Sequence, residues 1–129
     1  MKNALIIDDH AALRMGMKMV LDEVIPGILI TEAESFTSGL AAMRNEHFEL
    51  VILAINFQDS GKTDMIYAIR EILPTGNILI LSGSDDNKHA SDFINAGANG
   101  FLTKKTRIEE YKNAIQTLLK TGKYINPSV

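Results

Sequence analysis

The chain has 129 residues, the length of one ordinary domain, and 46% of them are hydrophobic and 22% charged, which excludes a generally disordered chain. Thirteen basic and sixteen acidic residues give a formal net charge of −3, so this stretch is not expected to bind a nucleic-acid backbone by bulk electrostatics. The absence of cysteine excludes a disulfide framework and a cysteine nucleophile and suits a reducing cytoplasm. No apolar run approaches the roughly eighteen residues that a membrane span requires. We therefore expect a cytoplasmic, single-domain protein.

Short apolar runs predict five β-strands, at residues 4–7, 28–30, 50–53, 78–81 and 100–102. Several runs are continuously apolar, which is typical of parallel strands covered on both faces. After each run, apolar residues recur with helical spacing. This periodicity predicts five helices, within residues 13–24, 36–43, 65–73, 93–96 and 108–119.

Turn and capping residues fall between these elements. Proline and glycine follow the first and third predicted helices, and Gly97 and Gly122 follow the last two, as is usual at helix ends. Ser35 is placed to cap the second helix. Thr106 with Glu109 fits a capping box on the fifth helix.

The alternation of strands and helices predicts an α/β fold with right-handed crossovers, a doubly wound (βα)5 domain around a five-stranded parallel sheet. In such sheets, ligands bind beyond the carboxyl ends of the strands. The residues that follow the strands are therefore the candidates for a functional site.

Polar residues that could carry chemistry follow three of the strands. Asp8 and Asp9 follow the first strand, Ser82 the fourth, and Lys104 the fifth. Two adjacent carboxylates favour a hard cation such as Mg²⁺, and a hydroxyl and an ammonium group suit phosphoryl oxygens. Taken singly, each has a simpler explanation: the acidic pair can complement a helix dipole, Ser82 can be a turn residue, and Lys104 a solvated charge.

The three histidines have simpler interpretations than metal ligation. His10 is expected to be a polar residue at the start of the first helix. His47 and His89 show no partner spacing and are expected at the surface.

The sequence resembles the receiver domains of bacterial two-component response regulators over nearly its whole length, and within them the NarL/FixJ (LuxR-type) subfamily. The resemblance is carried by LIIDDH at residues 5–10 with LRMGM at 13–17, by ILSG at 80–83, and by AGANGFLTKK at 96–105. It implies the flavodoxin-like receiver fold. It also implies a role in phosphorelay signal transduction rather than an enzyme.

The resemblance assigns roles to individual positions. Asp8 and Asp9 would hold Mg²⁺, with the backbone carbonyl of Asn56 as a further ligand. Ser82 would be the hydroxyl switch and Lys104 the partner of the phosphoryl group. Phe101 would be the aromatic residue whose inward or outward rotamer reports phosphorylation.

The sequence departs from the family at the phosphoacceptor. In the family, the phosphoacceptor Asp stands at the end of the third strand, and this sequence has Ala54 at that position. The methyl side chain of alanine has no nucleophilic oxygen. Magnesium should therefore bind weakly or not at all. Either the acceptor has been substituted, which the intact site residues favour, or this is a natural degenerate receiver that acts as a protein-interaction module. Asp59 lies in the following loop and is not expected to replace the acceptor, and that loop also lacks the proline usual in the family.

A phosphate-binding P-loop is a remote alternative. Gly61-Lys62-Thr63 matches the end of that motif, but the motif needs a glycine where this sequence has Asn56. Lys62 and Thr63 are more simply residues at the start of the third helix.

The resemblance also predicts the domain limits and partners. Residues 1–122 would form the receiver domain, and 123–129 the start of a linker toward an absent C-terminal helix-turn-helix domain. The expected partners are a sensor histidine kinase, a second copy of the chain in a homodimer, and DNA through the absent domain only; no membrane is expected. Phosphorylation would repack the face formed by the fourth helix, the fifth strand and the fifth helix.

Overall fold

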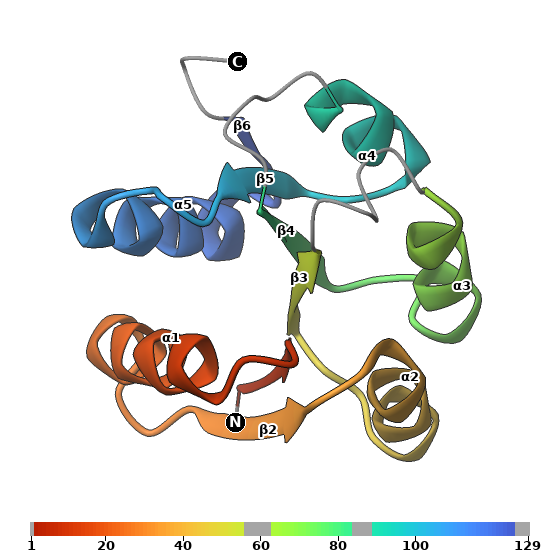
Figure 1. Cartoon of the computed structure of the whole chain (residues 1–129), viewed down its shortest axis with the longest axis horizontal. Helices are drawn as coiled ribbons and strands as arrows, with labels where there is room; N and C mark the ends of the chain where they lie inside the picture. The colour runs from red at the N-terminus through yellow and green to blue at the C-terminus, as the bar shows by residue number, and fades with distance from the viewer. Residues whose placement is uncertain (1, 56–62, 84–88, 126–129) are drawn as a thin grey trace.

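The structure of the chain is a computed structural model that describes residues 2–55, 63–83 and 89–125. Strands and helices alternate along the chain, as predicted (Figure 1). The strands are β1 (Asn3–Ile7), β2 (Leu29–Ala33), β3 (Leu50–Ile55), β4 (Asn77–Ser82), β5 (Gly100–Thr103) and β6 (Tyr124–Ile125). The helices are α1 (Ala11–Val24), α2 (Phe36–Asn45), α3 (Asp64–Ile72), α4 (Ala90–Ala96) and α5 (Ile108–Thr121).

The strands form one parallel sheet in the order β2-β1-β3-β4-β5-β6. The order reverses at β1, which lies between β2 and β3, and this reversal creates the switch point at which such sheets bind ligands. The doubly wound α/β class predicted from the sequence is confirmed.

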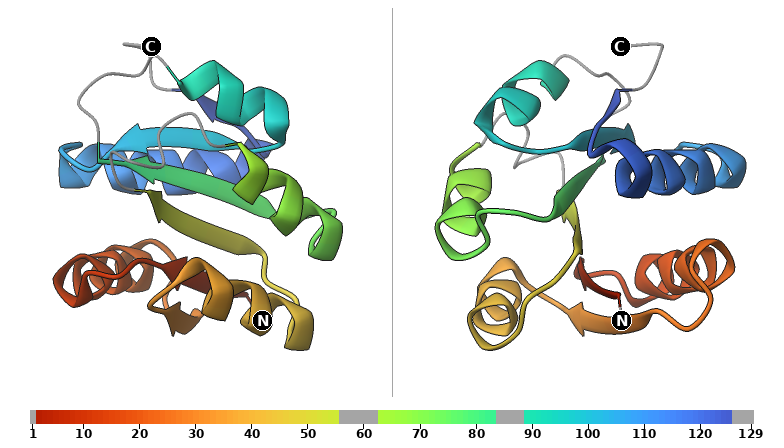
Figure 2. Two further views of the ribbon diagram at one scale, coloured as in Figure 1. Left: turned by 45° about the vertical axis from the view of Figure 1, so that its right-hand side comes forward. Right: turned by 180° about the vertical axis from the view of Figure 1, so that it is seen from behind.

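Helices cover both faces of the sheet. Figure 1 shows α1 and α5 on one side and α2, α3 and α4 on the other, and Figure 2 shows the same separation from two further directions. Alternate strand residues supply the two cores. Leu5, Val51 and Ile80 pack toward α2–α4, whereas Ile6, Ile52 and Leu81 pack toward α1 and α5. Burial on both faces explains why β3 is apolar throughout and why residues 78–81 of β4 form a continuous apolar run.

A short sixth strand was not predicted. Tyr124 and Ile125 pair with Gly100 and Phe101 of β5, within the stretch that the sequence assigned to a linker. The side chain of Tyr124 is buried in the core toward α5. The sheet therefore continues beyond Gly122, which ends α5 in the left-handed conformation (φ 78°) expected of a glycine there.

Of the two helix caps proposed from sequence, one is confirmed and one is wrong. The Ser35 hydroxyl accepts a hydrogen bond from the Ser38 backbone N–H at 3.1 Å and so caps α2. The cap of α5 is Arg107, without a side-chain capping bond. The helix begins one residue later than a Thr106 cap requires, and the Thr106 hydroxyl instead lies 3.4 Å from that of Thr103.

Within these three described segments, no helix is both long enough and apolar enough to cross a membrane.

Candidate functional site

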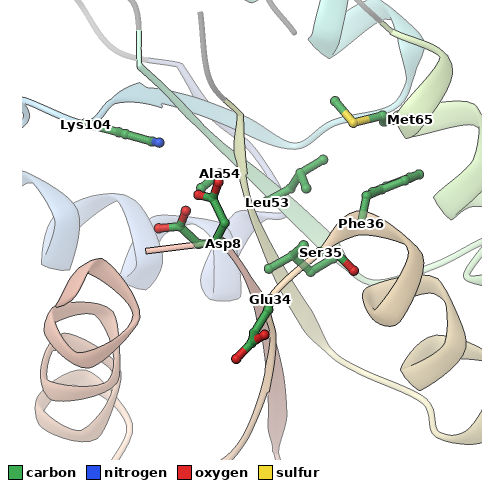
Figure 3. A pocket seen from close by; sticks show the side chains of 10 residues that line it. Asp8, Glu34, Ser35, Phe36, Leu53, Ala54, Met65 and Lys104 are labelled. Carbon is green, nitrogen blue, oxygen red and sulfur yellow. The ribbon is translucent and has the colours of Figure 1, made fainter. Parts of the chain in front are cut away.

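A cavity of about 210 Å³ opens beyond the carboxyl ends of β1, β2 and β3. In Figure 3 the Lys104 side chain enters from the side opposite Phe36 and Met65, with Ala54 and Asp8 between them. The lining residues are Ile7, Asp8, Asp9, Glu34, Ser35, Phe36, Leu53, Ala54, Met65 and Lys104.

The register of the sheet brings Asp8 to Ala54. Ile7 of β1 pairs with Leu53 of β3, so the next residue of each chain segment reaches the same edge, on the side of the sheet that α1 and α5 cover. The backbone N–H of Asp8 donates to the carbonyl of Ala33 at 3.0 Å, which fixes the end of β1 against β2. The half-buried methyl of Ala54 therefore stands beside a carboxylate.

The Asp8 carboxylate is the most buried charged group of the cavity, with 2% of its side chain exposed. Its Oδ1 accepts the backbone N–H of His10 at 3.3 Å, whereas its Oδ2 is buried and has no hydrogen-bond partner among the described residues. A buried carboxylate oxygen without a partner is costly. A cation is one group that would satisfy such an oxygen.

The ring of His10 joins the two aspartates. Its Nδ1 lies 2.9 Å from Oδ1 of Asp9 and 3.3 Å from Oδ1 of Asp8. His10 is indeed a polar residue at the start of α1, where it occupies the cap position without a side-chain capping bond. The sequence interpretation missed its contact with both carboxylates.

Arg14 of α1 fixes the backbone at the site. Its Nη1 donates to the carbonyl of Asp8 at 2.7 Å and its Nε to Glu32 Oε1 at 2.9 Å. Hydrogen bonds from Lys18 and then from Arg14 hold the pKa of Glu32 below its ordinary value. The charged residues of α1 thus tie the end of β1 to the edge strand β2.

Backbone hydrogen bonds align the other strand ends. The N–H of Lys104 donates to the carbonyl of Ser82 at 2.8 Å, and the N–H of Gly83 donates to that of Ile55 at 3.0 Å. Ser82 is 2% exposed and is not one of the residues that line the cavity. Lys104 lines it, and no ion pair of its ammonium group occurs among the described residues.

Phe101 lies inside the molecule, on the other face of the sheet. It is 2% exposed, and its ring centroid lies 5.8 Å from that of Phe93 in α4. On the opposite face of the sheet, the Tyr111 hydroxyl of α5 donates to the carbonyl of Thr103 at 3.1 Å. Burial raises the pKa of Tyr111 to about 12.

The structure thus brings Asp8, Asp9, Ala54 and Lys104 together around one cavity. Asn56, Asp59, Gly61 and Lys62 lie outside the described residues. His47 is exposed, and His89 lies 3.8 Å from Asp92.

Besides the strand residues Ile7 and Leu53, four lining residues were not identified as site residues from the sequence: Glu34, Ser35, Phe36 and Met65. The first three follow β2, and the rule that located the other strand ends would have found them had it been applied there. In Figure 3 the Glu34 carboxylate points away from Ala54.

The donor set fits a divalent cation, because two carboxylates converge and one of them offers a buried, unpartnered oxygen. The side chain at position 54 offers no nucleophile. The cavity can therefore hold a cation and an anionic group beside Lys104, but it cannot form an acyl phosphate at this position.

Comparison with known proteins adds a family match. The sequence profile described as the response regulator receiver domain matches residues 4–116. The chain is 29% identical over 126 residues to the nitrate/nitrite response regulator protein NarP of Escherichia coli (strain K12), covering 97% of this chain and 58% of that protein. It is 26% identical to the glycerol metabolism activator of Pseudomonas putida, covering 100% and 59%. The chain therefore spans less than two thirds of these relatives.

Solved structures show the same fold. A LuxR family DNA-binding response regulator from Silicibacter pomeroyi superposes with a TM-score of 0.83 at 23% identity, covering 98% of both chains. A response regulator protein from Burkholderia pseudomallei, solved with a phosphorylated aspartic acid, calcium ion and citrate, gives a TM-score of 0.76 at 23% identity, covering 93% of this chain and 69% of that one.

Proposed function

Because the chain belongs to the family of response regulator receiver domains, we propose that it is the regulatory domain of a DNA-binding regulator and that Ala54 prevents it from accepting a phosphoryl group. The chain is the receiver domain of a two-component response regulator. Its role is signalling, and we assign it no reaction of its own. The observation that carries the proposal is the methyl group of Ala54, beside Asp8 in the cavity that Lys104 enters.

Asp8 and Asp9 would hold Mg²⁺, which would supply positive charge to neutralise a phosphoryl group. Oδ2 of Asp8 supports this assignment because it is buried and has no hydrogen-bond partner in the described part of the chain. Lys104 would pair with an anionic group in the cavity. The backbone carbonyl of Asn56 is the third ligand that the resemblance proposes.

The output would run through Ser82 and Phe101. Ser82 ends β4, and the Phe101 ring lies against α4. A change at Ser82 would therefore be transmitted along β5 to the face formed by α4, β5 and α5. The ring of Phe101 is buried, which supports its assignment as the residue whose rotamer would report the state of the site.

The partners follow from the relatives, several of which are named as response regulators or transcriptional regulators. We propose a sensor histidine kinase as the upstream partner, a cytoplasmic location, and DNA contact through a helix-turn-helix domain outside this chain. Homodimerisation through the receiver is a further proposal. The sequence placed the end of the receiver at residue 122; because β6 adds to the sheet, we propose that the receiver extends through Ile125, with the linker after it.

The test is phosphorylation of the protein with acetyl phosphate and Mg²⁺, followed by mass spectrometry. The Ala54 protein should gain no phosphoryl group. Ala54→Asp should gain one that hydroxylamine removes, because the rest of the site is present. Ala54→Asn is the matched control, since it has the same shape without a nucleophilic carboxylate.

Two outcomes would contradict the proposal. If Ala54→Asp remains unmodified in excess donor, the remaining residues do not form a working site, and the degenerate receiver that acts as an interaction module is the better assignment. If the Ala54 protein itself is labelled, for instance on Asp59, position 54 is not the acceptor position.

A further inference from the structure

We propose that the outer face of α1 is the surface through which two copies of this chain associate, with the two α1 helices antiparallel about a twofold axis. This inference rests on the homodimerisation included in the proposed function and adds the surface and its geometry. It depends neither on a bound cation nor on phosphorylation.

The outer face of α1 carries two exposed methionines. Met15 and Met19 are 63% and 69% exposed and lie one helical turn apart, so their side chains share one face. The other exposed large apolar side chains of the described residues, Leu29, Tyr67 and Ile108, lie on three separate elements. In Figures 1 and 2 no described element lies beyond α1 on the side away from the sheet. A pair of exposed apolar residues at helical spacing is typical of a protein contact surface, and methionine adapts well to such contacts.

The same face ends in an open hollow. Its volume is about 520 Å³, and it is lined by Met19, Asp22, Glu23, Pro26 and Gly27. If the two Met19 side chains meet at the twofold axis of an antiparallel pair, position 15 of one helix lies opposite position 23 of the other. The exposed Met15 of each copy then reaches the hollow of the other copy. Each copy thus supplies both a projecting side chain and a recess, as a twofold contact requires.

Two charged residues beside the methionines indicate that the occupant is a second copy. Lys18 and Asp22 lie one turn apart along the flank of the face, but the Lys18 ammonium bonds Oε2 of Glu32 at 3.1 Å instead of Asp22. Asp22 is exposed and has no hydrogen bond or ion pair with any residue in the described part of the chain. It lies in the last turn of α1, where its charge opposes the helix dipole and no basic residue accompanies it.

An antiparallel pair would give Asp22 a partner. Lys18 of each copy would lie within one turn of Asp22 of the other, whereas a parallel pair would place the two Asp22 side chains together. An ammonium group has three N–H donors, so Lys18 can bond Glu32 and the second copy's Asp22 at once. Glu23, the other acidic residue of the hollow, is already paired with Lys112 of α5 at 2.8 Å. The charges of the face therefore complement an antiparallel copy of the same face.

The test is analytical ultracentrifugation of the unaltered protein over a concentration series. A contact made by one helix from each copy is small, so the dimer should be weak, and the series extends to about 1 mM. Met19→Glu should weaken dimerisation by about tenfold or more, because it places two carboxylates at the axis. Asp22→Lys should also weaken it, since the new ammonium group faces Lys18 of the second copy. Tyr67→Glu is the matched control: Tyr67 is 56% exposed on α3, on the opposite side of the sheet, and its loss should leave dimerisation unchanged.

The cysteine-free sequence allows the geometry to be tested as well. Met19→Cys adds one thiol per chain, and two such thiols near the twofold axis can form a disulfide, which requires Cα atoms about 4.5–7 Å apart. Oxidation should therefore link Met19→Cys into a covalent dimer, detected by non-reducing electrophoresis. Tyr67→Cys has its thiol on the far side of the sheet and should remain unlinked.

Three results would overturn the assignment. An unaltered protein that is monomeric at every concentration would exclude the contact. Dimerisation unchanged by Met19→Glu would place the homodimer on another face and leave the proposed homodimerisation intact. Equal linking of Met19→Cys and Tyr67→Cys would show that the thiols meet only by random collision. Phosphorylation of Ala54→Asp is measured separately, so failure of that reaction leaves these measurements unaffected.

Discussion

Asp8 has one carboxylate oxygen anchored by the backbone of His10 and one buried without a partner. A second carboxylate placed on β3 beside it would repel it in the absence of a cation and bind a cation jointly with it. The methyl group of Ala54 removes both effects. The residue that disables the proposed chemistry should therefore also stabilise the metal-free fold.

We expect Ala54→Asp to lower the metal-free free energy of unfolding by about 1–3 kcal/mol and to raise Mg²⁺ affinity. Urea unfolding and a Mg²⁺ titration measure the two effects. Ala54→Asn separates the effect of charge from that of size, because asparagine has nearly the shape of aspartate without its charge. This variant should lower the free energy of unfolding less than Ala54→Asp does and should gain little Mg²⁺ affinity. Equal Mg²⁺ affinity in the Asp and Ala proteins would contradict the prediction.

Tyr111 gives the fold a dependence on alkaline pH. Burial raises its pKa to about 12, against an ordinary value of about 10. Between pH 10 and pH 12 the unfolded chain loses the phenol proton of Tyr111, whereas the folded chain keeps it. The free energy of unfolding therefore falls as the pH rises through this range, and below about pH 10 the buried phenol causes no such loss. The slope is at most about 1.4 kcal/mol per pH unit.

We expect Tyr111→Phe to reduce the loss of stability between pH 9 and pH 11, as measured by urea unfolding at each pH. The same change removes a hydrogen bond to Thr103 and should cost about 1 kcal/mol at pH 9. Tyr67→Phe is the control, because Tyr67 is 56% exposed and its loss should leave the slope intact. Identical slopes in all three proteins would exclude Tyr111 as the source.

At the scale of the helices, two glycines in helix interiors are in opposite surroundings. A Cβ on Gly16 of α1 would meet no atom within 4 Å, whereas a Cβ on Gly39 of α2 would clash with the side chain of Ile7. Ile7 is the last residue of β1 and precedes Asp8. The close approach of α2 to the sheet at Gly39 therefore helps to position the site.

Gly16→Ala should raise the free energy of unfolding by about 0.5–1 kcal/mol, because alanine is the better helix former. Gly39→Ala should lower it by about 1–2 kcal/mol, since overpacking against Ile7 exceeds the gain in propensity. Thermal or urea unfolding distinguishes the two. A stabilising Gly39→Ala would mean that Ile7 moves aside without cost.

The strands were predictable from sequence where burial on both faces of the sheet requires a continuous run of apolar residues. β3 and β4 are buried on both faces and read as continuous apolar runs. β2 is an edge strand and is only partly buried, so its bounds were predicted poorly. Thr106 and Glu109 match a capping motif, yet the helix begins at Ile108. Whether Thr106 or Arg107 takes the cap position of α5 depends on packing that the capping motif does not encode.

The site was predictable only where it follows the sheet topology. Asp8, Asp9 and Lys104 stand directly after strands, and parallel pairing alone brings them to one edge. His10 was not identified, because its contact with the aspartates depends on the rotamers of neighbouring side chains. The proposed loss of the acceptor rests on the sequence, where Ala54 stands at the position that the resemblance assigns to the acceptor Asp.

At the scale of the whole molecule, Arg70 joins segments that are distant in sequence. Its guanidinium donates to the carbonyls of Gly97 and Gly76 and to Asn99 Oδ1, at 2.8–3.1 Å. Asn99 in turn donates to the Gly122 carbonyl at 2.8 Å. Burial lowers the pKa of Arg70. One side chain thus links the end of α3 to the turns before β4 and β5.

We expect Arg70→Gln to lower the free energy of unfolding by about 2–3 kcal/mol, because several buried carbonyls lose their donor. Arg44→Gln, at an exposed residue in the last turn of α2, should change it by less than about 0.5 kcal/mol. Urea unfolding measures both. Equal effects would mean that water replaces the guanidinium without cost.

The strand order has a consequence for the time course of folding. β1 pairs with both β2 and β3, and each later strand joins the one that precedes it in the chain. During synthesis, the sheet is therefore complete on one side once residue 55 is made. From then on it grows at a single open edge, and every new strand meets a partner that already exists. The hydrogen bond from Asp8 to Ala33 of β2 and the pairing of Ile7 with Leu53 of β3 belong to the earliest stage of this growth, before Lys104 has been synthesised.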